Sequence, residues 1–281
     1  MQGAIASQSA ELELKYKVCE ECGESLYLEQ IMLGEKRMLR RLCKCERDEY
    51  NTKENIEKNK DKQARLESLI KNSLMDSTFN EKTFENWDFS KGNRKMYNLG
   101  IRYTEKFSEL KAEGVGLLIH GDPGNGKTYL SCCIANRLLQ NYIPVICVSV
   151  IGLLSRIKET YNKWGSEAEA DILRGLGSAD LLIIDDLGTE TFTDWSRSTI
   201  YNIIDSRYRS KLPLIISANI QIDTSKTNGV LADLYGRRTE DRILEMCTPI
   251  KNSGASIRLE EAKRKTSFLK SLLLEGKHGE D

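Results

Sequence analysis

The sequence predicts an α/β protein whose main domain is a mainly parallel sheet flanked by helices, preceded by a small metal-binding domain and a helical linker. Between residues 77 and 260, short apolar runs alternate with amphipathic segments, which is typical of strands and helices built around a parallel sheet. Four cysteines cluster near the N-terminus. A densely charged stretch without Pro or Gly separates that cluster from the main domain.

Composition excludes several classes of protein. Of the 281 residues, 40% are hydrophobic, 30% are charged and only 4 are proline, so the chain is not collagen-like, proline-rich or wholly disordered. Lys plus Arg equal Asp plus Glu at 42 each, so any contact with nucleic acid must come from a local patch. No apolar run approaches the ~20 residues that cross a bilayer, and the first residues lack a signal core. We therefore expect a cytoplasmic protein without a membrane segment.

Changes in composition along the chain predict five segments. We expect a flexible tail over 1–10, the metal-binding domain over 11–48, a charged helical linker over 49–76, the main α/β domain over 77–260 and a C-terminal tail over 261–281. A flexible linker is the alternative for the charged stretch. The C-terminal tail is either a short helix or a frayed end, and its role is open.

The N-terminal cysteines have the spacing of a metal site. Cys19 and Cys22 form one close pair and Cys43 and Cys45 form another, so four thiolates can surround one tetrahedral Zn²⁺. The segment has few large apolar residues, so metal binding would supply missing folding energy, and a closed set of four thiolates favours a structural zinc. A redox dithiol pair or ordinary reduced cysteines are the alternatives. The other cysteines lie in apolar stretches, where Cys serves as a small buried hydrophobe: Cys132, Cys133, Cys147 and Cys247.

A phosphate-binding loop is the strongest motif. The strand-like run Gly116–His120 is followed by GDPGNGKT, which matches G-x-x-x-x-G-K-[ST], and then by a helical pattern. Backbone N–H groups of such a loop converge on phosphate oxygens, Lys127 supplies positive charge, and the Thr128 hydroxyl can bind Mg²⁺. A chance glycine-rich turn is the alternative, but the flanking strand and helix favour a nucleoside triphosphate site. Its residues are Gly121, Asp122, Pro123, Gly124, Asn125, Gly126, Lys127 and Thr128.

Two further strand ends carry polar side chains suited to this site. Four apolar residues over 181–184 precede Asp185 and Asp186, as in a central parallel strand that ends at the active edge of a sheet. We expect Asp185 to orient Mg²⁺ and Asp186 to polarise the attacking water. Asn219 follows the next apolar run and is placed to contact the γ-phosphate and that water. Ordinary surface turns are the alternatives for both strand ends.

These motifs carry a family resemblance. The order GDPGNGKT, LLIIDDLG, IISAN, DRILEMC and GASIR, from Gly121 to Arg258, resembles the AAA+ P-loop ATPases of the DnaC/DnaI helicase-loader and IstB group. The resemblance covers essentially the whole main domain. It implies ATP as cofactor and substrate, with Mg²⁺, and hydrolysis that is weak unless subunits assemble.

The resemblance also implies roles for two arginines. Arg242 matches the arginine finger that reaches a neighbouring subunit's nucleotide, and Arg258 matches the arginine that senses nucleotide in its own subunit. A guanidinium is always charged and its fork suits phosphate oxygens. Arg237 and Arg238 are close enough in sequence to be the finger instead, and an ordinary surface arginine is the alternative for each.

An arginine supplied in trans implies a homo-oligomer built by head-to-tail contacts, as a ring or an open spiral. In the loader family, single-stranded DNA is held by the loop after the acidic strand and by the helical insertion after the second strand. An exposed Trp can stack on a base, although Trp is more often a core residue. The matching positions are Thr193, Trp195, Arg156, Lys158, Lys163 and Trp164.

An N-terminal zinc domain on such an ATPase is similar to the DnaI-type arrangement, in which that domain grips the replicative hexameric helicase. The resemblance therefore implies an ATP-dependent loader that places the helicase on single-stranded DNA during initiation of DNA replication. An IstB-like transposition helper acting on duplex DNA is one alternative. A non-hydrolysing zinc adaptor that keeps ATP as a structural ligand is another, because Asp186 stands where Glu is more usual.

Overall fold

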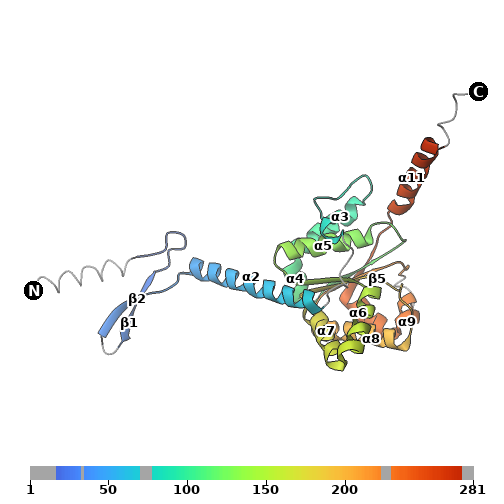
Figure 1. Ribbon diagram of the computed structural model, residues 1–281. Coiled ribbons are helices and arrows are strands. Elements are labelled where there is room, and N and C mark those ends of the chain that lie inside the picture. Colours follow the sequence, from blue (N-terminus) through green and yellow to red (C-terminus); the bar gives the residue numbers. More distant parts are fainter. Residues whose placement is uncertain (1–16, 33–34, 70–77, 223–228, 274–281) are drawn as a thin grey trace, which may run out of the picture. The chain divides into compact units, whose positions relative to one another are not determined.

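The structure is a computed structural model that describes residues 17–32, 35–69, 78–222 and 229–273 (Figure 1). The chain divides into two compact units, Met1–Asp61 and Lys62–Asp281. Parts of the predicted segments lie outside the described residues, among them all of the tail over 1–10, residues 70–76 of the linker and the end of the C-terminal tail.

The first unit contains a short hairpin and the start of a long helix. Strands β1 (Tyr27–Met32) and β2 (Glu35–Arg40) pair antiparallel, and both are largely exposed. Helix α2 (Lys44–Leu69) follows directly, and acidic and basic side chains alternate along it, including ion pairs one turn apart such as that between Lys53 and Glu49. Among the described residues of this unit, Cys43 alone is buried, so they form no apolar core around the hairpin.

The second unit is built on five parallel strands in the order β4-β5-β6-β3-β7. The strand that precedes the phosphate-binding loop, β3, lies between β6 and β7, and β5 lies beyond β6. The predicted parallel sheet is therefore confirmed. The strand bounds are β3 (Gly116–His120), β4 (Val145–Ser149), β5 (Leu181–Leu187), β6 (Leu214–Ala218) and β7 (Cys247–Lys251).

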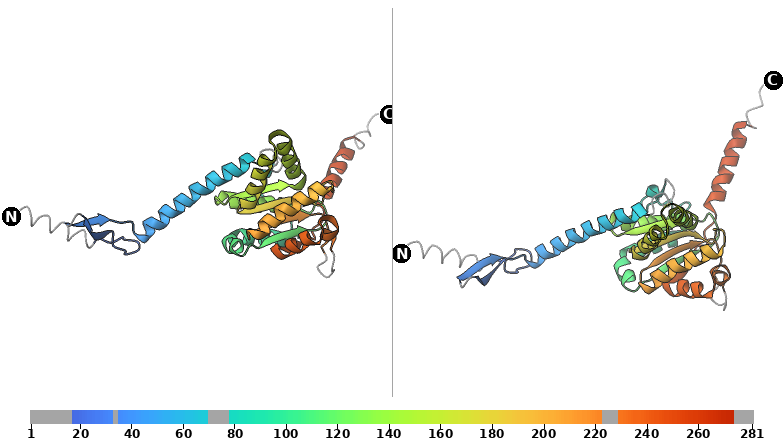
Figure 2. Two further views of the ribbon diagram at one scale, coloured as in Figure 1. Left: turned by 90° about the horizontal axis from the view of Figure 1, so that it is seen from below. Right: turned by 60° about the horizontal axis from the view of Figure 1, so that its bottom comes forward.

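Alternating side chains of these strands enter two separate cores. Leu118 and Ile184 belong to the core on one face, while Ile119 and Ile183 belong to the core on the other face. Because both faces are apolar, each needs its own layer of helices. The views in Figure 1 and Figure 2 show these layers on opposite faces of the sheet.

One layer contains α3 (Arg94–Glu105), α4 (Phe107–Ala112) and α5 (Lys127–Gln140), after the short helix η1 (Phe79–Glu81). The other layer contains α6 (Val150–Trp164), α7 (Ser166–Ser178), α8 (Asp194–Arg209), α9 (Val230–Tyr235) and α10 (Arg237–Met246). The four cysteines expected to act as small hydrophobes are all buried in this unit.

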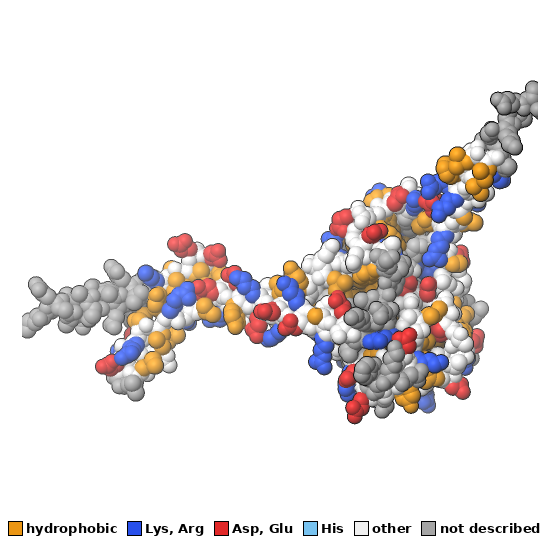
Figure 3. Space-filling view, in the orientation of Figure 1, with side chains coloured by type: hydrophobic (Ala, Val, Ile, Leu, Met, Phe, Trp, Pro, Cys, Tyr) orange, Lys and Arg blue, Asp and Glu red, His pale blue; other side chains and the backbone are white. Residues whose placement is uncertain are grey.

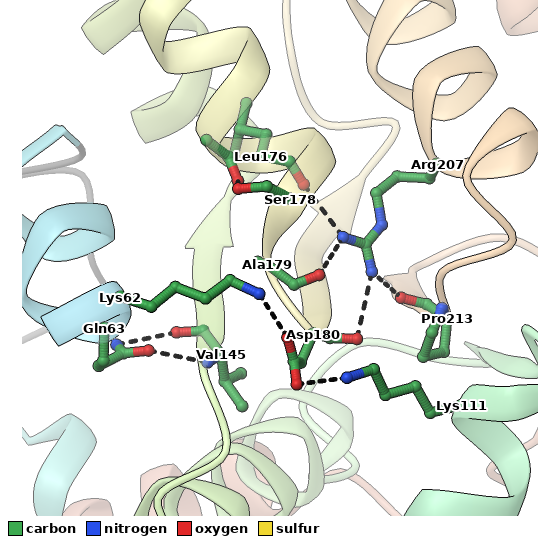
Figure 4. A network of polar contacts seen from close by, with 11 residues as sticks. Lys62, Gln63, Lys111, Val145, Leu176, Ser178, Ala179, Asp180, Arg207 and Pro213 are labelled. Atoms are coloured by element: carbon green, nitrogen blue, oxygen red, sulfur yellow. Dashed lines mark hydrogen bonds and ion pairs between the residues drawn. The ribbon is translucent and has the colours of Figure 1, made fainter. Parts of the chain in front are cut away.

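A buried polar network holds the start of β5 (Figure 4). The Asp180 carboxylate accepts from Lys62 at 2.6 Å and from Lys111 at 2.5 Å. The Arg207 guanidinium is completely buried and donates to the carbonyls of Leu176, Ala179 and Pro213. Because side chains from α2, α4 and α8 meet here, the segment that leads into β5, the strand that carries Asp185, is held in place just before its first residue.

The last helix is largely unpacked. Helix α11 (Ile257–Leu273) has no buried residue, and hydrophobic side chains lie along its outer half (Figure 3). They include Phe268, Leu269 and Leu272, each more than half exposed. Among the described residues, no helix has both the length and the apolar character needed to cross a membrane.

Candidate active site

The segment predicted to bind phosphate, residues 121–128, follows β3 and leads into α5, which is the strand, loop and helix order that the sequence predicts. Gly121, Gly124 and Gly126 all have φ in the left-handed range that disfavours side chains. A Cβ on Gly121 would lie 2.4 Å from the Asn252 carbonyl oxygen, and one on Gly124 would lie 2.4 Å from the Ser256 hydroxyl. The glycines therefore allow a tight loop whose backbone N–H groups and helix N-terminus can receive phosphate.

Lys127 begins α5 and is 4% exposed. Its Nζ donates to the carbonyl oxygens of Gly121 at 3.0 Å and Asp122 at 2.7 Å, and to Asn125 Oδ1 at 3.2 Å. Burial lowers the pKa of Lys127, while the charges of Asp186 and Asp185 oppose that shift. All three hydrogen-bond acceptors are neutral, so an anion entering the loop would stabilise this desolvated ammonium.

The two predicted acidic residues lie at the end of β5 and differ in environment. Asp185 is 2% exposed, and burial raises its pKa, while hydrogen bonds from Ser217 and Thr128 oppose the rise. A divalent cation would favour the ionised form, so Asp185 and Thr128 offer a carboxylate and a hydroxyl suited to Mg²⁺. Asp186 has a φ of 55°, and its carboxylate accepts from Asn219 Nδ2 at 3.1 Å. The structure thus joins residues from three predicted motifs.

Ser217 completes this group and was missed by the sequence analysis. Its hydroxyl donates to Asp185 Oδ1 and accepts from the backbone N–H of Asp186 at 3.0 Å. The sequence signal that could have pointed to Ser217 is its place as a polar residue inside the apolar run of β6. Its role depends on the pairing of β5 with β6, which the sequence pattern alone does not give.

Lys127, Thr128, Asp186 and Asn219 line one cavity of about 230 Å³. Arg258 reaches it because the N–H of Ile257, at the start of α11, donates to the Gly124 carbonyl at 2.9 Å. Lys82, Tyr129 and Ile257 were not predicted to line it. The lining residues are Lys82, Gly124, Gly126, Lys127, Thr128, Tyr129, Asp186, Asn219, Ile257 and Arg258.

A second cavity, also of about 230 Å³, shares Gly126, Tyr129 and Ile257 with the first. Trp87 and Met96 contribute apolar surface to it. The Trp87 ring packs edge-on against Tyr129 with centroids 5.5 Å apart. A cavity lined by the predicted phosphate-binding loop, beside one with aromatic lining, has the shape and chemistry suited to a nucleotide, with phosphates in the first and a base in the second.

Arg242 does not line either cavity. Its Nη2 lies 2.8 Å from Asp205 Oδ1, and its guanidinium stands over the rings of Tyr201 and Tyr208, about 5 Å from each centroid. The chain therefore holds Arg242 away from its own nucleotide loop. Arg237 and Arg238 are exposed at the start of α10.

The structure describes the side chains of four of the six residues predicted to contact DNA. Thr193 caps α8, because its Oγ1 accepts from the N–H of Ser196 at 3.1 Å, and Trp195 is 41% exposed. On α6, Arg156 is half-buried and Lys158 is exposed. The side chains of Lys163 and Trp164 lie outside the described part of the chain.

The four N-terminal cysteines form one cluster, with their sulfur atoms all within 4.8 Å of one another. Cys19 and Cys22 precede β1, while Cys43 and Cys45 lie at the start of α2. Hydrogen bonds from backbone N–H groups lower the pKa of Cys22 to about 6. Four sulfurs at this separation could hold one tetrahedral ion such as Zn²⁺, and the exposed hairpin has little else to stabilise it.

Comparisons with known proteins agree with this geometry. The chain is 29% identical over 183 residues to the replicative helicase loader DnaC of Buchnera aphidicola subsp. Schizaphis graminum, covering 65% of this chain and 71% of that protein. It is 25% identical over 211 residues to the replicative helicase loader DnaI of Bacillus subtilis (strain 168), covering 72% and 67%. The crystal structure of the DnaC helicase loader matches with a TM-score of 0.52 and 23% identity, covering 63% of this chain and all of that one.

The solved structure supports the predicted AAA+ fold, and the named relatives confirm the predicted resemblance. The family described as IstB-like ATP binding protein matches residues 48–266, which is most of the chain. This protein therefore belongs to the IstB-like ATP-binding protein family.

Proposed function

We propose that this protein is an ATP-dependent loader that binds a replicative hexameric DNA helicase and places it on single-stranded DNA during initiation of replication. One observation carries the proposal: Lys127, Asp186, Asn219 and Arg258 converge on a single cavity in a chain whose relatives are named replicative helicase loaders.

The residues around the cavity suit ATP hydrolysis. The loop N–H groups and Lys127 bind the phosphates, and the cavity beside Trp87 receives the base. Mg²⁺ held by Thr128 and Asp185 would neutralise charge on the phosphates. Asp186 polarises the attacking water, and Asn219 holds its carboxylate in place.

Turnover on this account needs a second copy of the chain. Arg242 acts on the nucleotide of a neighbouring subunit through head-to-tail contacts, with Arg237 and Arg238 as alternatives for the role. The Asp205 carboxylate and the two tyrosine rings, all on α8, keep the guanidinium against that helix. Hydrolysis is therefore slow until subunits assemble.

Nucleotide state controls assembly in this proposal. Asn219, Arg242 and Arg258 contact the γ-phosphate only when ATP is bound, so ATP favours an assembled, DNA-competent state and hydrolysis releases it. Single-stranded DNA is held through Trp195 and Thr193 and through Arg156 and Lys158 on α6.

The N-terminal unit binds the helicase. We propose that Cys19, Cys22, Cys43 and Cys45 hold one structural Zn²⁺, supported by the close approach of their sulfur atoms. The metal would supply folding energy that the exposed hairpin lacks, and so present a fixed surface to the partner.

A transposition helper acting on duplex DNA is the second candidate, and the IstB name of the matched family favours it. The two functions differ in the DNA that they prefer. Tighter binding to duplex than to single-stranded oligonucleotides of equal length would favour the transposition helper. A zinc adaptor that keeps ATP as a structural ligand would bind ATP without turning it over.

The test measures unwinding of a forked DNA by the replicative helicase of the same source, with this protein and ATP. We expect wild type to accelerate the onset of unwinding. Arg242→Ala should bind ATP normally but lose turnover and acceleration, whereas Lys106→Ala, at an exposed ion pair on the opposite layer, should match wild type. Normal turnover by Arg242→Ala would defeat the trans role of Arg242.

A further inference from the structure

A third cavity, of about 400 Å³, lies between the first turns of α8 and α10. It shares no lining residue with the cavity around Lys127. Its lining combines three arginines with hydroxyl-bearing side chains and one glycine: Arg197, Ser198, Tyr201, Tyr235, Gly236, Arg237, Arg238 and Thr239.

Within the described part of the chain, no carboxylate pairs with the three arginines. Carboxylates are missing from the lining, and among the described residues none of Arg197, Arg237 and Arg238 forms an ion pair. Arg242, further along α10, contrasts with them because Asp205 neutralises it at 2.8 Å. Guanidinium groups that converge from two helices without a carboxylate favour an anion, and their forked donors match phosphate oxygens.

The backbone adds to this preference. Gly236 has a φ of 84° and precedes α10 without a side-chain cap. The N–H groups of Thr239 and Glu240 donate to the Gly236 carbonyl, whereas those of Arg237 and Arg238, which both line the cavity, have no acceptor among the described residues. The hydroxyl of Ser198 lines the same cavity from α8. Three cations, a hydroxyl and a helix N-terminus therefore face one open space.

We propose that Arg197, Arg237 and Arg238 form a phosphate site that binds the backbone of single-stranded DNA. The proposal rests on the loader function given above and names a contact for its DNA step. Trp195 is 41% exposed and precedes Ser198, which lines the cavity, by three residues on α8, so these two side chains are neighbours on the helix surface. An exposed indole at the edge of a cavity with three arginines is suited to a single strand, with a base on the ring and phosphates on the arginines.

Phosphate could also reach this cavity from the nucleotide of a neighbouring subunit, so the experiment separates the two sources. The first arm measures binding of a fluorescein-labelled oligothymidylate of about 20 nucleotides by anisotropy, over a series of salt concentrations. The variants are Arg197→Ala and the double variant Arg237→Ala/Arg238→Ala. The control is Arg174→Ala/Arg264→Ala, which removes the same charge from two side chains that are each 74% exposed elsewhere.

We expect the double variant to bind about tenfold more weakly than wild type near physiological salt. The slope of log affinity against log salt should fall by about 0.7 for each phosphate that an arginine no longer neutralises, hence by about 1.4 for the double variant. Arg197→Ala should show about half of that slope change, and the control should keep the wild-type slope. Thermal unfolding of each variant checks that the fold is intact.

The second arm measures ATP turnover after mixing the double variant with Lys127→Met chains, which have intact arginines but an impaired loop. Unchanged DNA binding together with turnover that is restored by mixing assigns the site to a neighbour's nucleotide and overturns the DNA source. Unchanged DNA binding and unchanged turnover overturn the phosphate site altogether. A wild type without affinity for the oligonucleotide overturns the DNA source together with the DNA step of the loader proposal.

Discussion

The hydroxyl of Ser217 donates a hydrogen bond to the buried carboxylate of Asp185 and accepts one from the backbone N–H of Asp186. One side chain on β6 therefore orients both acidic residues at the end of β5. Ser217 is itself completely buried, so water cannot replace it.

Ser217→Ala should reduce turnover more than nucleotide binding. Loss of a buried hydrogen bond to a charged group costs about 1.5–3 kcal/mol, so we expect a roughly tenfold to hundredfold fall in turnover. The measurement compares kcat with the dissociation constant for ATP. Ser131→Ala is the matched control, because Ser131 is equally buried and its hydroxyl has no hydrogen-bond partner among the described residues. Equal effects in the two variants would contradict the orienting role.

Lys127→Met should abolish ATP binding without lowering the stability of the nucleotide-free protein. Burial lowers the pKa of Lys127, so its ammonium is held at a cost that an apolar side chain of similar length avoids. The measurement is thermal unfolding with and without ATP. Wild type should gain stability with ATP and Lys127→Met should not, while their melting temperatures without nucleotide agree or favour the variant. A large loss without ATP would contradict this account of Lys127.

Asp180→Asn should lower the free energy of unfolding at neutral pH. The difference in this free energy between wild type and variant should shrink in acid. Burial pushes the pKa of Asp180 up, but the hydrogen bonds and charges of Lys111 and Lys62 outweigh it and leave the pKa lowered. The carboxylate therefore adds stability above its unfolded pKa of about 4, and loses it as pH falls through the lower folded value. Urea unfolding at pH 7 and at about pH 3 measures the difference between wild type and variant at each pH. The same difference at both pH values would contradict a stabilising role for the ionised Asp180 carboxylate.

Arg207→Met should be among the most destabilising single changes in the second unit. It leaves the carbonyls of Leu176, Ala179 and Pro213 buried without their donor, at about 3 kcal/mol or more in the free energy of unfolding. Arg209→Met, two residues along α8 with a side chain that is 75% exposed, should cost less than about 1 kcal/mol. Chemical denaturation measures both, and similar costs would contradict the role of Arg207.

Replacing Cys43 and Cys45 by Ser should remove bound zinc without affecting ATP binding. The four sulfur atoms lie within one cluster in the first unit, whereas every residue around the nucleotide cavity belongs to the second. Elemental analysis should find one zinc per wild-type chain and less than a tenth of that in the variant. Full zinc retention would mean that the cluster does not hold the metal.

The parts of the fold that the sequence predicted are those encoded by neighbouring residues. The run Gly116–His120 became β3, and the glycine-rich loop after it leads into a helix as predicted, because strand periodicity and glycine spacing are local signals. Asp186 and Asn219 lie within hydrogen-bond distance because the carboxyl ends of parallel strands share one edge of a sheet. The catalytic roles assigned to them stay predictions.

Contacts between distant elements were not predictable in this way. Arg207 resembles a surface residue on a charged helix, and only packing of α8 against the start of β5 shows that it is buried. Likewise the pairing of Arg242 with Asp205 joins α10 to α8, so the sequence could suggest a role for Arg242 but not where its own chain holds it.

The most direct test of the loader proposal is size-exclusion chromatography of this protein with the replicative helicase of its source, in ATP and in ADP. The account predicts co-elution that is stronger in ATP and is lost in the Cys43→Ser/Cys45→Ser variant. Absence of a complex in both nucleotides would contradict helicase loading and would favour the transposition helper.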